Sequence, residues 1–136
     1  MKIFFPKELD SEARISITPD FLKKYIDSGL KVSVQTSIGL HLGFKDEIYK
    51  ELGAEIVDRK KGLKEGNIIC SVNKLSGEDL IDVKENSLVV SFLDPFNDKE
   101  LVEDLKAKKI SSISMELIPR TTRAQKMDAL SSQANL

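Results

Sequence analysis

The sequence is poor in the residues that build metal centres and disulfide frameworks. Its 136 residues include one Cys (Cys70), one His (His41) and no Trp. A single Cys excludes an internal disulfide framework and a Cys-rich zinc site, and a single His argues against a histidine-based metal centre. We therefore expect no metal site and a chain that folds in a reducing compartment.

The chain also lacks a charge imbalance and a long apolar run. Lys and Arg number 21 and Asp and Glu 22, a formal net charge of -1 that points neither to nucleic acid nor to an anionic membrane. Apolar runs such as Leu88–Val90 are much shorter than the roughly 18 residues of a membrane span, and residues 1–6 are too short for a secretory signal. We expect one soluble domain, which is short for a self-contained enzyme with a nucleotide cofactor.

Glycine is missing where a nucleotide-binding loop would need it. The chain has seven Gly but neither a G-x-G-x-x-G nor a G-x-x-x-x-G-K-[ST] pattern. The first apolar run, 2–5, is followed by Pro6-Lys7-Glu8-Leu9 without a glycine. Because glycines let backbone N–H groups approach a pyrophosphate, their absence excludes the usual phosphate-binding loop from these residues.

Short apolar runs alternate with helical patterns along the chain. The spacing predicts helices over 18–29, 45–52 and 97–108, a charged segment after the third strand, and a turn at 76–79 that leads into a polar connection. Strands are predicted at 2–5, 31–35, 54–57, 67–72, 87–93 and 110–115. The predicted fold class is α/β: a Rossmann-like, mostly parallel sheet with helices on both faces, lacking the glycine-rich nucleotide loop.

The final segment, 123–136, has the pattern of a two-faced helix. Its polar side carries uncharged groups and one carboxylate, where most surface helices carry Glu and Lys. The apolar side consists of Met127, Leu130 and Ala134, and the polar side of Gln125, Asp128, Ser132 and Asn135. Helix stop signals are missing at its end, so we expect either a continuation beyond Leu136 in the natural protein or a frayed tail.

The polar segment 116–125 follows the last predicted strand and is the most informative for function. It lies at the carboxyl edge of the predicted sheet, where α/β proteins bind ligands. It leads into the helix described above, whose uncharged polar groups suit an amide-bearing ligand or a domain contact, and Arg120 adds charge for a phosphate or carboxylate. The alternative is a polar interdomain helix without chemistry.

Few other side chains indicate chemistry. Arg14 precedes a helix start and can hold an anion with its guanidinium fork, although an exposed loop Arg is the commoner case. His41 is flanked by apolar residues, which favours a structural or exposed His over an acid or base. Cys70 lies in an apolar strand and is expected to be inert and buried. Asp94-Pro95 follows the fifth predicted strand, where two interpretations stay open: a ligand contact or an ordinary turn that ends the strand.

Residues 119–136 (P-R-T-T-R-A-Q-K-M-D-A-L-S-S-Q-A-N-L) resemble a family signature, P-R-x-[ST]-R-A-Q-x-M-D-x-L-S-S-Q-[AS]-N-L. It belongs to the alpha subunit of proton-translocating NAD(P) transhydrogenase. The start of the chain, with M-K-I, P-K-E and E-A-R-I-S-I-T-P, is similar too. Alanine dehydrogenase shares this N-terminal domain. However, Ser71 and Asp94 stand where that family has its catalytic Lys and His, so alanine/pyruvate chemistry is not expected. The fourth strand also departs from the W-K-V-Q-R-P-like run common in transhydrogenases.

The resemblance implies half of a cofactor cleft. In the NAD(H)-binding component the nucleotide lies between two Rossmann-like domains, and the glycine-rich loop belongs to the second. Here residues 1–120 would be the N-terminal domain and 121–136 the start of the helix that links it to an NAD-binding domain. The resemblance assigns the nicotinamide contacts to Arg120, Gln125, Asp128 and Ser131, with Gln125 in the catalytic position, bridging toward NADPH. The cofactors implied are NAD on this component and NADP on its partner.

The resemblance also implies partners and a location. The partners are the second NAD-binding domain of the same subunit and the NADP-binding and membrane components, with a homodimer in the full subunit. The component would be cytoplasmic and peripheral on the inner face of the membrane, or on the matrix side in a mitochondrion. The whole complex transfers hydride between NAD(H) and NADP(H) with proton translocation, and the isolated chain is expected to be inactive. The alternatives are a stand-alone, non-catalytic binding or interaction module and an alanine dehydrogenase-like enzyme.

Overall fold

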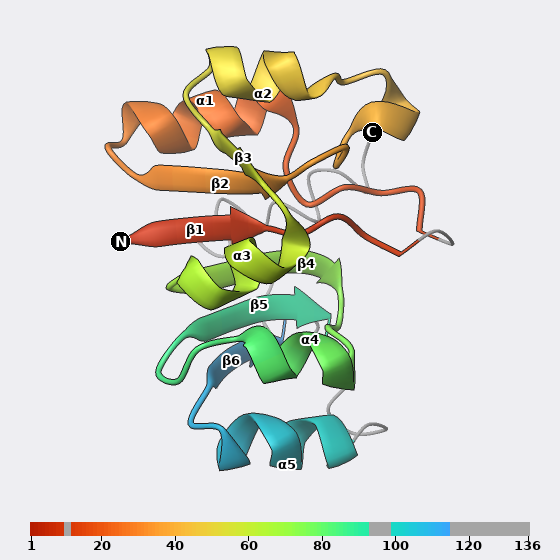
Figure 1. Cartoon of the computed structure of the whole chain (residues 1–136), viewed down its shortest axis with the longest axis vertical. Helices are drawn as coiled ribbons and strands as arrows, with labels where there is room; N and C mark the ends of the chain where they lie inside the picture. Colours follow the sequence, from red (N-terminus) through yellow and green to blue (C-terminus); the bar gives the residue numbers. More distant parts are fainter. Residues whose placement is uncertain (10–11, 93–98, 115–136) are drawn as a thin grey trace, which may run out of the picture.

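Six parallel strands in the order β3-β2-β1-β4-β5-β6 form the centre of the computed structural model (Figure 1). The structure describes residues 1–9, 12–92 and 99–114. The strands are β1 (Lys2–Phe5), β2 (Lys31–Gln35), β3 (Glu55–Val57), β4 (Ile68–Asn73), β5 (Leu88–Phe92) and β6 (Ser111–Ser114). Every neighbouring pair is parallel, so the predicted fold class is confirmed.

The connections between the strands are helical, including two that the sequence pattern did not predict. The helices are α1 (Pro19–Asp27), α2 (Asp46–Glu51), α3 (Arg59–Glu65), α4 (Gly77–Asp82) and α5 (Lys99–Ala107), with a 3₁₀ turn, η1, at Leu40–Leu42. The expectations of a charged segment before β4 and a turn with a polar connection before β5 were therefore incomplete. Both segments are short and mostly polar, so neither shows helical apolar spacing, and their N-caps define them instead. Asp58 accepts a hydrogen bond from the backbone of Lys61 at 2.8 Å, and Ser76 forms a capping box with Asp79.

The helices cover both faces of the sheet. In Figure 1 β1, β2 and β5 run across the view with their carboxyl ends to the right, and α1 and α2 lie at the top and α4 and α5 at the bottom. One buried cluster joins α1 and α2 to β1 and β2, and includes Ile3, Phe5, Leu22, Val32, Val34 and Tyr49. The other joins α3, α4 and α5 to the opposite face, and includes Phe4, Leu63, Ile69, Leu80, Val89 and Leu105. Alternation along β1, with Phe4 on one face and Ile3 and Phe5 on the other, divides the core between the two faces.

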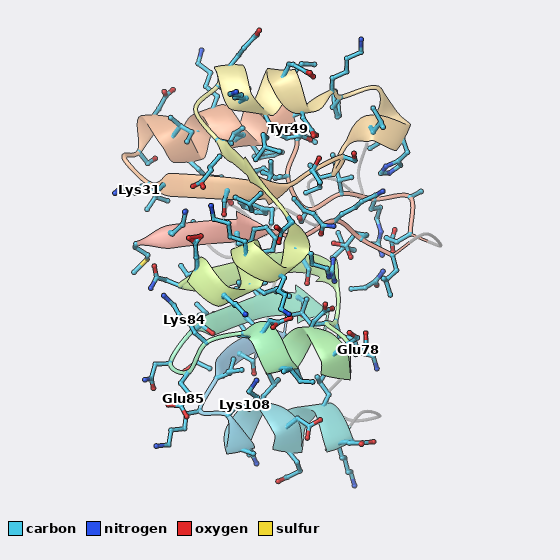
Figure 2. The ribbon with its side chains drawn as sticks, viewed as in Figure 1. Lys31, Tyr49, Glu78, Lys84, Glu85 and Lys108 are labelled. Atoms are coloured by element: carbon cyan, nitrogen blue, oxygen red, sulfur yellow. The ribbon has the colours of Figure 1, made fainter. Side chains whose placement is uncertain are left out.

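Tyr49 connects α2 to the segment before α1 through a buried hydrogen bond. Its side chain lies below α2 in Figure 2, and the residue is fully buried. The Tyr49 hydroxyl donates a hydrogen bond to the carbonyl of Ile17 at 3.0 Å. Burial raises the pKa of Tyr49 to about 12, so the hydroxyl remains a donor at physiological pH.

Helix α3 packs so closely on β1 that Gly62 has no room for a side chain. A Cβ at Gly62 would lie 2.1 Å from Cε1 of Phe4, which is itself fully buried. The glycine therefore sets the distance between this helix and the centre of the sheet.

Gly62→Ala should lower the free energy of unfolding, because the methyl group would force Phe4 or the whole helix to move. We expect a loss of about 1–3 kcal/mol from overpacking, larger than the helix propensity gained by replacing glycine. Urea unfolding followed by circular dichroism measures it. The control is Lys64→Ala, at an exposed position of the same helix, which should change stability by less than about 0.5 kcal/mol. Equal stability of the two variants would contradict the close approach.

Candidate functional site

The carboxyl edge of the sheet between β1 and β4 is the point where the strand order reverses. The connection after β1 leads to α1 on one face, and the connection after β4 leads to α4 on the other. The two loops therefore diverge and leave a crevice between the ends of their strands. In open α/β sheets this is the usual place for a ligand.

Glu8 places a carboxylate in this crevice. One of its oxygens accepts a hydrogen bond from the backbone N–H of Val72 and the other from that of Asn73, each at 2.9 Å. Burial raises the pKa of Glu8, and the two backbone hydrogen bonds oppose that effect. These N–H groups at the end of β4 are thus satisfied by the protein's own carboxylate, and not by an anionic ligand.

A second carboxylate, Glu12, joins Glu8 at the same edge. It accepts a hydrogen bond from the side-chain amide of Asn73 at 2.8 Å. It also forms a bidentate ion pair with Arg14, with Nε and Nη2 of the guanidinium 2.9 and 3.1 Å from the two carboxylate oxygens. The guanidinium of Arg14 lowers the pKa of Glu12 to about 2. The guanidinium of Arg14, which the sequence suggested for anion binding, is therefore paired with the carboxylate of Glu12.

Arg59, at the start of α3, connects three further elements at this edge. Its Nε and Nη2 donate to the two carboxylate oxygens of Asp79 on α4, both at 2.8 Å. Its Nη1 donates to the carbonyl of Lys7 at 2.7 Å and to the side-chain oxygen of Gln35 at 3.1 Å. Burial opposes ionisation of Asp79, but the hydrogen bonds from Arg59 and Ser76 prevail and lower its pKa. One guanidinium thus fixes the ends of β1 and β2 relative to α3 and α4.

A pocket of about 450 Å³ opens beside the crevice, between the loop after β1 and η1. It is lined by Lys7, Glu8, Leu9, Glu12, Ala13, Leu40 and His41. Leu9 and Leu40 are 66% and 56% exposed, so its rim is apolar. His41 is exposed and its Nε2 lies 2.8 Å from the carbonyl of Ala13, which makes Nε2 the donor. His41 therefore has the structural or exposed role that the sequence favoured.

Cys70 and Ser71 have structural surroundings. Cys70 is half-buried as a residue, and burial of its thiol raises the pKa to about 12, so its expected inertness is supported. Ser71 is 4% exposed and its hydroxyl donates to the carbonyl of Asn73 at 2.8 Å. That bond closes the irregular end of β4, where the register with β5 shifts.

The residues that the resemblance assigned to nicotinamide lie outside the described residues. These are Arg120, Gln125, Asp128 and Ser131, and the same holds for Asp94 and for the domain boundary at residue 120. They stay predictions. Conversely, sequence reasoning missed Glu8 and Arg59 as organisers of the carboxyl edge. The available signal was a charged residue shortly after a buried strand, which at this edge of a parallel sheet often has a partner from a neighbouring loop.

Two properties of the described residues, 1–9, 12–92 and 99–114, bear on function. Within them no group of His, Cys, Asp and Glu side chains is arranged to hold a metal ion. None of their helices has the length and apolar character needed to cross a membrane.

The strand order and the crevice between β1 and β4 define a Rossmann-like α/β domain whose phosphate-loop position is occupied by carboxylates. A family model described as "Alanine dehydrogenase/PNT, N-terminal domain" matches residues 4–136. The chain belongs to this family, as the sequence resemblance predicted.

Curated relatives favour the transhydrogenase branch of the family. The chain is 36% identical over 137 residues to NAD(P) transhydrogenase subunit alpha of Haemophilus influenzae, covering 100% of this chain and 27% of the relative. It is 35% identical over 138 residues to NAD(P) transhydrogenase subunit alpha of Cereibacter sphaeroides, covering 100% and 26%. Alanine dehydrogenase 1 of Staphylococcus aureus is 29% identical, covering 98% and 36%.

Solved structures agree with the fold. The transhydrogenase from Sinorhizobium meliloti aligns with a TM-score of 0.89 and 30% identity, covering 99% of this chain and 41% of that chain. An L-alanine dehydrogenase aligns with a TM-score of 0.83 and 24% identity, covering 90% and 34%. The chain thus spans 26% to 36% of the length of these three curated relatives.

The ion pair of Glu12 predicts a measurable titration. In Arg14→Gln the pKa of Glu12 should rise from about 2 some of the way toward the ordinary 4.5, because the guanidinium is lost while the Asn73 amide remains. Since the folded-state pKa is depressed, the pair stabilises the fold above pH 4.5 and this contribution is lost as the pH falls toward 2. Carboxyl-carbon NMR follows the titration. Glu55, whose pKa is lowered by Lys2, is the internal control and should not change. A Glu12 midpoint that stays at its wild-type value would contradict the assignment.

Proposed function

We propose that this chain is the N-terminal domain of the NAD(H)-binding component of a proton-translocating NAD(P) transhydrogenase. The supporting observation is that transhydrogenase alpha subunits are 35% to 37% identical over the whole chain, including the polar segment at its end. The intact complex transfers hydride between NAD(H) and NADP(H), and couples the transfer to proton movement through a membrane component.

The carboxyl edge supports the proposal that two domains bind different parts of the nucleotide. Glu8 and Glu12 occupy the place where a glycine loop would hold a pyrophosphate, and their negative charges disfavour a phosphate there. The pyrophosphate is instead held by a second Rossmann-like domain of the same subunit. The domain described here supplies side chains that face the nicotinamide.

The side chains proposed for the nicotinamide are Arg120, Gln125, Asp128 and Ser131. Arg120, Asp128 and Ser131 hold the carboxamide and its surroundings, and Gln125 bridges toward NADPH on the partner component. The bound nucleotides supply the redox chemistry, so these residues orient the ring and do not transfer protons. Orientation matters because hydride transfer requires two rings in a near-attack geometry.

The proposed partners are the NADP-binding and membrane components, with a homodimer of the full subunit. This places the domain in the cytoplasm, peripheral on the inner face of the membrane, or on the matrix side in a mitochondrion. An alanine dehydrogenase-like activity is less favoured. Ser71 stands where the resemblance places that family's catalytic Lys, and its buried hydroxyl is bonded to the carbonyl of Asn73.

Gln125→Asn in the assembled transhydrogenase should slow hydride transfer about tenfold or more, because the shortened side chain no longer reaches toward NADPH on the partner component and the two rings lose their alignment. Stopped-flow transfer from NADH to an NADP analogue measures the rate. Gln133→Asn, the same change in the same segment, is the matched control and should leave the rate unchanged. Unchanged turnover in Gln125→Asn would remove this residue from the site. Pyruvate-dependent NADH oxidation would favour the alanine dehydrogenase alternative.

The chain of residues 1–136 should not bind NADH tightly by itself. The phosphates contribute much of the binding energy of a dinucleotide, and the residues after β1 present carboxylates in their place. Isothermal titration calorimetry should detect no micromolar binding to this chain. The assembled protein, titrated under the same conditions, should bind. Micromolar affinity of the 136-residue chain would contradict the two-domain cleft.

A further inference from the structure

The two faces of β5 and β6 differ in how well they are covered. On the face toward α4 and α5, Val89 is 1% exposed and belongs to the buried cluster. On the opposite face Leu88 and Val90 are only half-buried, and Ile113 is 40% exposed. The register pairs Val90 with Ile113, so their side chains share that face. Leu88, Val90 and Ile113 together are called the β5–β6 face below.

The distribution of the described helices explains why none of them covers this face. Helices α1 and α2 lie on the same side of the sheet, but their cluster is built on β1 and β2 and extends only to Ile68 and Cys70 of β4. The three residues of the β5–β6 face lie outside both clusters of described residues. Parallel sheets are normally buried on both faces, so an apolar element is needed here.

The chain that follows β6 can reach this face. Residues 115–122 can span about 26 Å when extended. A helix over 123–136 would be about 21 Å long. Since adjacent strands are only about 4.8 Å apart, such a helix is long enough to cover both β5 and β6. Its apolar side, defined by Met127, Leu130 and Ala134, matches the aliphatic chemistry of the β5–β6 face. A second copy of the chain is a poorer occupant, because three side chains are far less than the roughly 1,200 Å² that a stable dimer buries.

We propose that residues 123–136 dock as a helix on the β5–β6 face, with their apolar side against the sheet. The polar side, with Gln125 and Asp128, then points away from the sheet and stays available to a ligand. This docking does not depend on nucleotide binding. Its failure would leave the proposed function in place, and a failure of the Gln125 experiment would leave the docking in place.

Cys70 is a built-in reporter for this docking. It is the one cysteine of the chain, and the register places it beside Val90 at the border of the β5–β6 face. Leu130→Asp puts a charge into the proposed contact and should raise the rate of Cys70 alkylation by iodoacetamide about tenfold or more, through local opening. Ser132→Asp adds the same charge to the polar side and should leave the rate unchanged. Urea unfolding of each variant separates local opening from global destabilisation.

The outcomes are distinct. Equal alkylation rates in wild type, Leu130→Asp and Ser132→Asp would overturn the proposal. An alkylation rate that falls as protein concentration rises, together with a dimer in sedimentation, would assign the face to a second copy and also overturn it. If Leu130→Asp fails to fold, a short bismaleimide should cross-link Cys70 to Cys introduced by Leu130→Cys, but not to Cys introduced by Ser132→Cys. Equal cross-linking of the two variants would contradict the orientation of the helix.

Discussion

The constraint on which this structure depends is the handedness of its strand connections. Crossovers between parallel strands are right-handed. The chain first adds strands in one direction, from β1 to β3, and then returns to add β4, β5 and β6 on the other side of β1. The helices of these two stretches therefore lie on opposite faces of the sheet. The buried clusters follow this rule, with α1 and α2 on one side and α3, α4 and α5 on the other. The same rule creates the crevice between β1 and β4, where the two paths diverge. It also leaves the outer half of one face without a described helix.

The crevice shows how a Rossmann-like sheet can lose its phosphate site and keep its shape. A phosphate loop stabilises the diverging strand ends by binding an anion on backbone N–H groups. Here Glu8 supplies that anion from within the chain, bonded to the N–H groups at the end of β4. Arg59 braces the adjoining strand ends through Asp79, Gln35 and the carbonyl of Lys7. The edge is thus held together by the protein's own side chains, which suits the proposed role of a domain that presents side chains to a cofactor held elsewhere.

The success of sequence reasoning differed between the strands, the helices and the site. The six strands were predictable because buried parallel strands are short apolar runs, and the predicted 31–35 coincides with β2. Helices α3 and α4 were missed because each buries too few apolar residues to show a period. Glu8 and Arg59 were missed because their partners are about 20 to 65 residues away in sequence. The nicotinamide residues came from a family signature, and the described residues do not test them.

In the proposed docking, the final segment has to meet a packing requirement and a chemical one. A helix that presents Gln125 and Asp128 to a cofactor must be held firmly from behind, because a misplacement of about 1 Å can cost about a hundredfold in rate. The β5–β6 face offers a support, since Val90 stands on β5, whose other face places Val89 in the buried core, and β5 pairs with β6 through Val90 and Ile113. Apolar residues on one side of the segment and uncharged polar groups on the other are what such a position requires. If the proposed docking holds, the unusual polar side and the sheet face that no described helix covers have one explanation: the sheet holds the helix, and the ligand contacts its polar side.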